Sequence, residues 1–149
     1  MTPPDARSAR RRTIVGTALV AALAAVLIAI VVVRSSGEKV LNENGGTLVL
    51  VGESNDNQMM SQVVGELTDV EGCLGVTADG GTLLVVWPHG TTIKTPEPLR
   101  VTVDGETYGI GDTVTLGGGA VGPLRTSSAF YDKVPSGCRD ADVFVAHDN

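Results

Sequence analysis

The chain begins with one long apolar segment and continues with a polar stretch and a series of short apolar runs. Thr13–Val33 contains 21 consecutive residues without a formal charge. A helix of this length, at about 1.5 Å per residue, crosses a hydrocarbon core about 30 Å thick. Four arginines precede the segment, whereas Arg34 and Lys39 follow it. The positive-inside rule therefore predicts a cytoplasmic arm at residues 1–12, a single transmembrane helix and export of everything after Arg34.

The apolar segment favours a retained anchor over a cleaved signal peptide. Signal peptides have a shorter apolar core of about 7–15 residues, so cleavage near Ser35 or Ser36 is the weaker alternative. A lipid anchor is excluded, because no cysteine follows the segment directly. Ala21, Ala25 and Ala29 share one helical face, which would allow two helices to approach closely. Chance spacing in an alanine-rich segment is the favoured interpretation, so homo-oligomerisation through the helix is not predicted.

Residues 34–62 are mostly polar, and this composition predicts a stalk that contains one candidate strand. The β-rich run Thr47–Val51 interrupts them. This run either pairs with the domain that follows or forms an exposed apolar segment. Fully extended, residues 35–62 would span at most roughly 90–100 Å.

From Val63 onward the pattern is one of short β-type runs separated by turn residues. Asp-Gly and Gly-Asp pairs supply the residues that tolerate positive φ in tight hairpins. No helical apolar period is sustained for even three turns. The pattern predicts an all-β domain over residues 63–149, a small barrel or sandwich with an OB-like barrel among the candidates. The predicted strands are Val63–Leu67, Cys73–Thr77, Thr82–Trp87, Leu99–Val103, Thr107–Ile110, Thr113–Leu116 and Val143–Ala146.

Trp87 is the only tryptophan and precedes a predicted turn, Pro88-His89-Gly90. It fits either a core position or an exposed aromatic that binds a ligand. Four apolar residues, Leu83–Val86, run directly into it, and this favours the core.

The distribution of charge supports the division of the chain into a basic N-terminal part with its apolar segment and an acidic exported part. Overall, 42% of residues are apolar and the formal charge is −6. Residues 1–34 hold five arginines and one aspartate, which give +4, so residues 35–149 carry −10. A body this acidic cannot neutralise phosphates over a broad face, and general nucleic-acid binding is excluded.

Cys73 and Cys138 are the only cysteines. A pair in an exported domain is usually structural. A redox pair or a metal site would need Cys-x-x-Cys spacing or histidine partners, and the sequence offers neither. A disulfide that closes a loop of this length contributes about 4 kcal/mol in the chain-entropy treatment. This contribution matters in a small domain, because only 3% of the residues of the chain are aromatic.

Catalytic motifs are lacking in the sequence. His89 and His147 are the only histidines, no Gly-x-Ser-x-Gly elbow occurs, and both histidines are expected at the surface. The acidic pairs Asp104/Glu106 and Asp140/Asp142 are expected to be solvated turns. We therefore predict no catalytic residue, no metal site and no cofactor.

The glycine run Gly117–Gly119 is the best of several weak site candidates. It lacks the Lys-Ser/Thr and helix of a phosphate-binding loop. A structural role, in which the strand bends or approaches another backbone closely, is favoured. The alternative is a turn where a ligand approaches the backbone of Gly117, Gly118 and Gly119, beside Trp87 and His89.

Several short motifs occur in an order that is similar to a known type of domain. Gly72-Cys73, Trp87-Pro88-His89-Gly90, Gly111-Asp112-Thr113-Val114, Gly117–Gly119 and Cys138 follow one another. This order resembles a small exported or lipid-anchored β domain of bacteria, especially high-GC Gram-positives, over roughly residues 63–146. The resemblance implies a compact β domain and a Cys73–Cys138 pair, and it carries over no catalytic residues. This chain departs from the lipidated relatives in its helical anchor.

The leading hypothesis is a non-enzymatic cell-envelope protein that spans the membrane once and binds a protein or wall component outside the cell. The alternative is an envelope hydrolase or metal-dependent enzyme near the glycine run. It would gain support if His89, Asp112 and a further acid lined one pocket, and it would fail if the His89 and Asp112 side chains pointed to opposite faces of the barrel. A third hypothesis is a regulator that acts through its cytoplasmic arm.

Overall fold

The computed structural model describes residues 37–43, 45–54 and 59–147. The predicted cytoplasmic arm and transmembrane helix lie outside the described residues. Among the residues it does describe, no helix has the length and apolar character needed to span a bilayer. The compact unit begins at Gly37.

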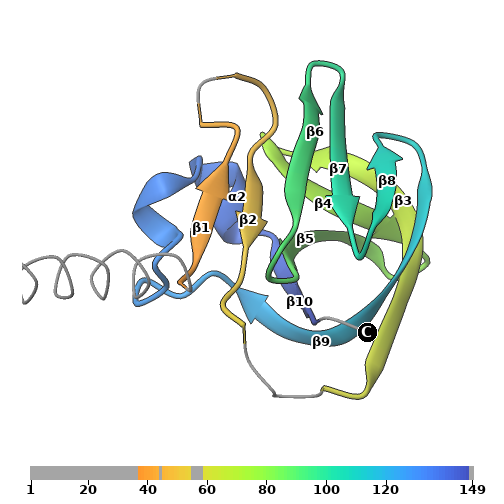
Figure 1. The fold of residues 1–149 in the computed structure, drawn as a ribbon. Coiled ribbons are helices and arrows are strands. Elements are labelled where there is room, and N and C mark those ends of the chain that lie inside the picture. The colour runs from red at the N-terminus through yellow and green to blue at the C-terminus, as the bar shows by residue number, and fades with distance from the viewer. Residues whose placement is uncertain (1–36, 44, 55–58, 148–149) are drawn as a thin grey trace, which may run out of the picture. The chain divides into compact units, whose positions relative to one another are not determined.

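The described part of the chain is predominantly β, as predicted, with two short helical turns before the last strand (Figure 1). The helical turns are η1 (Tyr131–Lys133) and α2 (Ser136–Asp140). The strands are β1 (Lys39–Leu41), β2 (Val49–Val51), β3 (Ser61–Val70), β4 (Cys73–Ala78), β5 (Gly81–Trp87), β6 (Thr92–Pro96), β7 (Leu99–Val103), β8 (Glu106–Gly109), β9 (Thr113–Pro123) and β10 (Asp142–Ala146).

The strands form a seven-stranded sheet and a separate three-stranded sheet, β6-β7-β8. The larger sheet has the order β1-β2-β5-β10-β9-β3-β4, and β4 also pairs with β5. The pairings β3-β4-β5-β10-β9-β3 therefore close on themselves as a ring of five strands. β2 and β10 flank β5 and are both parallel to it, whereas the other pairings are antiparallel.

The parallel strands β2, β5 and β10 carry continuous apolar runs, and both faces of these runs are largely buried. In β5, Val85 and Trp87 belong to one core cluster, while Leu84 and Val86 belong to another. Strands covered on both faces read as continuous apolar runs rather than alternating ones. Trp87 is fully buried in the first cluster, so its predicted core position is confirmed.

The two core clusters divide the domain. The ring core unites inward side chains of the ring with Leu99, Val101 and Val103 of β7, so the three-stranded sheet packs against it. The outer core joins the opposite face of β2, β5 and β10 to Phe130, Val134 and Cys138 of the segment before β10. Residues 124–141 thus cover the outer face of the parallel strands, and we refer to them as the cover segment.

The folded unit includes residues that the sequence analysis assigns to the stalk. Val49–Val51 is a fully buried strand between β1 and β5. Of the two alternatives for the run Thr47–Val51, the structure therefore shows pairing with the domain rather than an exposed apolar segment. Lys39–Leu41 pairs with it as β1. The unit begins 26 residues before Val63, which leaves residues 34–36 as the connection to the apolar segment.

Two strand features differ from the sequence expectation. β6, with the sequence Thr-Ile-Lys-Thr-Pro, was not predicted, because it offers one apolar residue and forms by pairing with β7. β9 continues from Leu116 through the glycine run to Pro123, because neighbouring backbones on both sides bond to it.

Close backbone approach in the ring makes glycine necessary at Gly75. A Cβ atom there would lie 2.1 Å from the carbonyl oxygen of Leu83 and 2.5 Å from Val70 Cγ2. We expect Gly75→Ala to destabilise the protein by about 3 kcal/mol, at the upper end of typical overpacking costs. Chemical denaturation of the full chain measures this loss.

Gly80→Ala is the matched control, because a Cβ at Gly80 has nothing within 4 Å. We expect its free energy of unfolding to stay within about 0.5 kcal/mol of the native value. Equal losses in the two variants would contradict the assignment of a steric role to Gly75.

Candidate functional site

The glycine run lies inside β9 rather than in a turn. Gly118 and Gly119 are opposite Ala146 and Val145 of β10. A Cβ at Gly118 would lie 2.0 Å from the carbonyl oxygen of Val145. Gly118 therefore admits the backbone of β10, which is the structural role that the sequence favoured, whereas a Cβ at Gly119 would meet the Met59 side chain.

Trp87 and His89 stand at the end of β5. The Trp87 indole is fully buried, and its Nε1 has no hydrogen-bonding partner among the described residues. His89 lies in the turn after β5 and is half-buried rather than fully solvated. Neither residue lines either of the two pockets described below, so neither of these pockets brings Trp87 and His89 to the glycine run.

One pocket, of about 590 Å³, lies between β9 and the β7–β8 hairpin. We call it the acidic pocket, because Asp104 and Glu106 line it together with Tyr108 and no lysine or arginine does. The Tyr108 hydroxyl donates a hydrogen bond to the Glu106 carboxylate. This bond, together with burial and the negative charges of Glu106 and Asp104, raises the pKa of Tyr108 above its ordinary value of 10.0.

The acidic pocket brings together residues that sequence reasoning treated separately. Gly117 and His147 line it beside the acidic pair, and the backbone N–H of His147 donates to the carbonyl of Gly117 at 3.1 Å. The sequence analysis expected His147 at the surface, whereas the residue is half-buried. Its ring Nε2 lies 2.9 Å from the carbonyl oxygen of Met59.

His89, Asp112 and a further acid do not line either of these two pockets together. Asp112 lines neither pocket, and its carboxylate accepts a hydrogen bond of 2.7 Å from the backbone N–H of Gly109. It therefore stabilises the turn between β8 and β9. Across residues 37–43, 45–54 and 59–147, no group of three His, Cys, Asp or Glu side chains could hold a metal ion.

A second pocket, of about 490 Å³, opens over the outer face of β5 and β10, and we call it the β5–β10 pocket. Its floor is apolar, with Val86, Val143 and Val145 from the parallel strands. Its charged groups are Glu38, Glu53 and Arg125. The remaining lining residues are Gly52, Val121, Pro123, Leu124, Ser127, Ser128, Ala129 and Phe130.

Sequence reasoning missed the β5–β10 pocket because its walls come from separate stretches of the chain. Glu38 and Glu53 belong to the segment read as a stalk, whereas Arg125 belongs to the cover segment. No motif links these residues. The only signal in the sequence was the continuous apolar character of β5 and β10, which indicates burial rather than a pocket.

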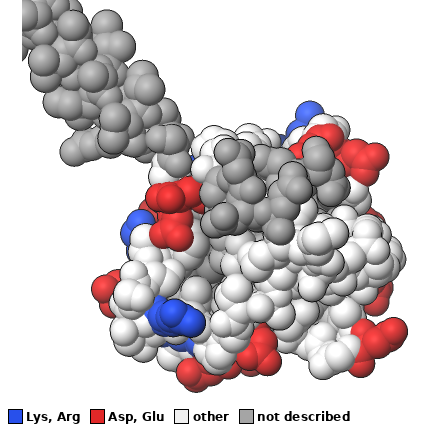
Figure 2. All heavy atoms as spheres, turned by 90° about the horizontal axis from the view of Figure 1, so that it is seen from below, with Lys and Arg blue, Asp and Glu red and all other residues white. Residues whose placement is uncertain are grey.

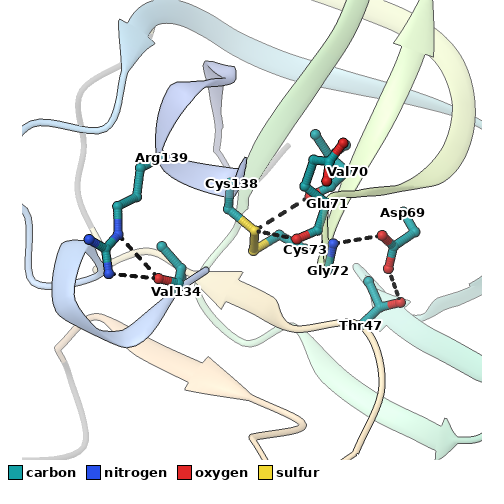
Figure 3. Close-up of a disulfide and its surroundings, with 9 residues drawn as sticks. All are labelled: Thr47, Asp69, Val70, Glu71, Gly72, Cys73, Val134, Cys138 and Arg139. Carbon is teal, nitrogen blue, oxygen red and sulfur yellow. Dashed lines mark hydrogen bonds between the residues drawn. A yellow bond between two sulfur atoms is a disulfide. The ribbon is translucent and has the colours of Figure 1, made fainter. Parts of the chain in front are cut away.

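The disulfide between Cys73 and Cys138 is present, as predicted, and joins β4 to α2 (Figure 3). The sulfur atoms are 2.09 Å apart and the Cα atoms 6.1 Å apart. Cys138 Sγ lies 3.4 Å from the carbonyl oxygens of Val70 and Glu71. Both cysteines are fully buried, so the bond fixes the cover segment to the β3–β4 turn.

The β3–β4 turn also holds the segment before β2. Glu71 and Gly72 both have positive φ, at 52° and 96°. The Asp69 carboxylate accepts hydrogen bonds from the backbone N–H of Gly72, at 2.7 Å, and from the Thr47 hydroxyl (Figure 3). The backbone N–H of Leu48 donates to the carbonyl of Gly72 at 2.8 Å. One turn thus connects the N-terminal strands, the ring and the cover segment.

Removal of the disulfide tests its contribution to stability. We expect Cys73→Ala combined with Cys138→Ala to lower the free energy of unfolding by about 4 kcal/mol, because the unfolded chain gains freedom. The thermal midpoint should fall by more than about 15 °C. A reductant should lower the midpoint of the native protein and leave that of the double variant unchanged, and an insensitive native protein would refute the prediction.

The raised pKa of Tyr108 can be tested by titration. A raised pKa means that folding favours the neutral phenol. Its contribution to stability is present below pH 10 and is lost as the pH rises through the raised pKa. We expect Glu106→Ala to shift the tyrosinate absorbance titration of Tyr108 downward, measured in a Tyr131→Phe background. Asp79→Ala, which removes a carboxylate from the β4–β5 turn, should leave the titration unchanged.

Comparison of this chain with protein-family models, with curated proteins and with solved structures found no match. The resemblance to the exported bacterial domain therefore stays a prediction. The Cys73–Cys138 pair that this resemblance implies is present. The functional argument accordingly depends on the chain's own chemistry.

Proposed function

We propose that the protein is a single-pass membrane protein whose β domain lies outside the cell and serves the envelope as a binding or structural module. The observation that carries this proposal is the buried Cys73–Cys138 disulfide. Structural disulfides persist in oxidising compartments and are rare in the cytosol. The apolar segment Thr13–Val33 and its arginine-rich flank supply a route of export with the same orientation.

The connection between the predicted span and the folded unit is short. Only residues 34–36 separate the apolar segment from the folded unit that begins at Gly37. At 3.3–3.6 Å per residue, the Cα of Glu38 lies at most about 18 Å from that of Val33. This chain length supports a tethered domain without a long stalk.

The charge of the domain supports a role other than nucleic-acid binding. Residues 35–149 carry −10. Acidic side chains stand around much of the margin of the face in Figure 2, and a broad central area of that face is uncharged. Such a surface repels phosphate backbones.

The strand order supports an OB-type barrel as the finer description of the ring. In chain order the ring strands are β3, β4, β5, β9 and β10, whereas the spatial order exchanges the last two. OB barrels are five-stranded Greek-key barrels that bind ligands with the loops after the first and fourth strands. The corresponding loops here are the β3–β4 turn and the cover segment, and the disulfide joins them. Because an OB-type fold serves many functions, the fold does not identify a ligand, and a ligand has to be inferred from the residues of the site.

The cysteine redox state in intact cells tests the proposed location. The cells are lysed in a denaturant, so that the two buried cysteines become accessible. We expect the denatured full chain to resist a maleimide reagent until a reductant is added, because both thiols are oxidised outside the cytoplasm. A variant that lacks residues 1–34 is the control. It should stay in the cytoplasm and react without a reductant. External protease should degrade the domain of the full chain in spheroplasts, and protection from protease would overturn the proposal.

A further inference from the structure

The β5–β10 pocket has an unusual position if the chain is anchored as proposed above, and the inference here depends on that anchor. Glu38 lines the pocket and is the second residue of the folded unit. Its Cα lies within about 18 Å of Val33 along the chain. The rim of the pocket is therefore held within reach of the bilayer surface, where lipids are the most abundant molecules.

The floor of the pocket fits an apolar occupant. Val86 and Val143 are 6% and 1% exposed and present their side chains to the outer core. Val145 of the floor is only half-buried, and Val121 on the wall is 48% exposed. A volume of about 490 Å³ falls in the range of small-molecule sites, about 300–1,000 Å³. An acyl chain segment would cover the apolar surface that remains open.

The rim of the pocket carries both signs of charge. Arg125 supplies one guanidinium group, and Glu38 and Glu53 supply two carboxylates. Within the described residues, none of these three side chains has an ion pair or a hydrogen-bonding partner. A guanidinium binds phosphate well, and a carboxylate binds a primary ammonium group. The combination is complementary to a headgroup that contains both groups.

We propose that the β5–β10 pocket binds a zwitterionic phospholipid with a primary ammonium headgroup, of the phosphatidylethanolamine class. One acyl chain lies on Val86, Val143 and Val145. The phosphate contacts Arg125, and the ammonium contacts Glu38 or Glu53. An anionic lipid fits less well, because two carboxylates then face a headgroup that lacks a cation.

Photolabelling of the full chain in vesicles tests this proposal. The vesicles consist of phosphatidylcholine with a small share of phosphatidylethanolamine that carries a photoactivatable diazirine on one acyl chain. Mass spectrometry maps the adducts. We expect adducts within residues 121–130 and 143–145, in addition to those on the apolar segment. Parallel vesicles with diazirine-labelled phosphatidylglycerol should give weaker labelling of these two regions.

Two pairs of variants identify the pocket. Val121→Asp places a charge on the apolar wall and should reduce pocket labelling about tenfold. Val64→Asp is its control, because Val64 is 54% exposed on β3 and lies outside the pocket. Arg125→Gln should reduce pocket labelling about threefold. Its control is Arg100→Gln, because the Arg100 side chain is exposed on β7 and lies outside the pocket; in this variant the pocket should be labelled as strongly as in the native protein.

The outcomes separate this inference from the proposed function. Retention of the chain in the membrane after an alkaline wash is measured on the same samples. A retained chain without pocket labelling overturns the lipid site alone, as do equal losses in Val121→Asp and Val64→Asp. Stronger pocket labelling by phosphatidylglycerol, or crosslinks from the pocket to a protein or a second copy, also overturns the lipid site. A chain that the wash removes overturns the anchor and this inference together.

Discussion

The parallel strands β2, β5 and β10 need apolar cover on both faces, and most of the domain follows from this requirement. Their side chains alternate between the ring core and the outer core, so the sequence contains uninterrupted apolar runs such as Leu83–Trp87. Closure of the ring buries the inner faces. The outer faces have no second sheet against them, and only the cover segment shields them. The long connection between β9 and β10 is therefore a structural necessity.

The cover segment cannot fold without attachment, and this explains the position of the disulfide. Its helical turns have three and five residues, far below the length at which isolated helices are stable. Phe130, Val134 and Cys138 are its buried anchors. Cys138 bonds covalently to β4, while Gly137 packs so closely on Glu71 that a Cβ would lie 2.5 Å from Glu71 Cβ. The bond thus attaches to the ring a layer whose helical turns are too short to be stable alone.

The local pattern of apolar residues predicted the strands that carry an apolar run. It did not predict the strands that form only because a neighbouring strand hydrogen-bonds to them. β5 and β10 were predicted closely from Leu83–Trp87 and Val143–Ala146. Lys39–Leu41 and Thr92–Pro96 are short or polar and become strands because a neighbour bonds to them. The glycine run is extended for the same reason. The cysteine pair was predictable from composition and export, because only one pairing exists. The β5–β10 pocket was not, because its residues meet only after folding.

The β5–β10 pocket is a part of the outer face that the first residues of the cover segment border but do not fill. The disulfide draws the cover segment toward the β3–β4 turn, so Cys138 and Val134 pack beside Cys73 and Leu50 in the outer core. Val145 stays half-buried beyond Phe130, and Val121 remains exposed. Filling this gap with larger apolar side chains would remove exposed surface at little structural cost. The sequence instead surrounds it with Glu38, Glu53 and Arg125, the three charged side chains that we propose contact a lipid headgroup.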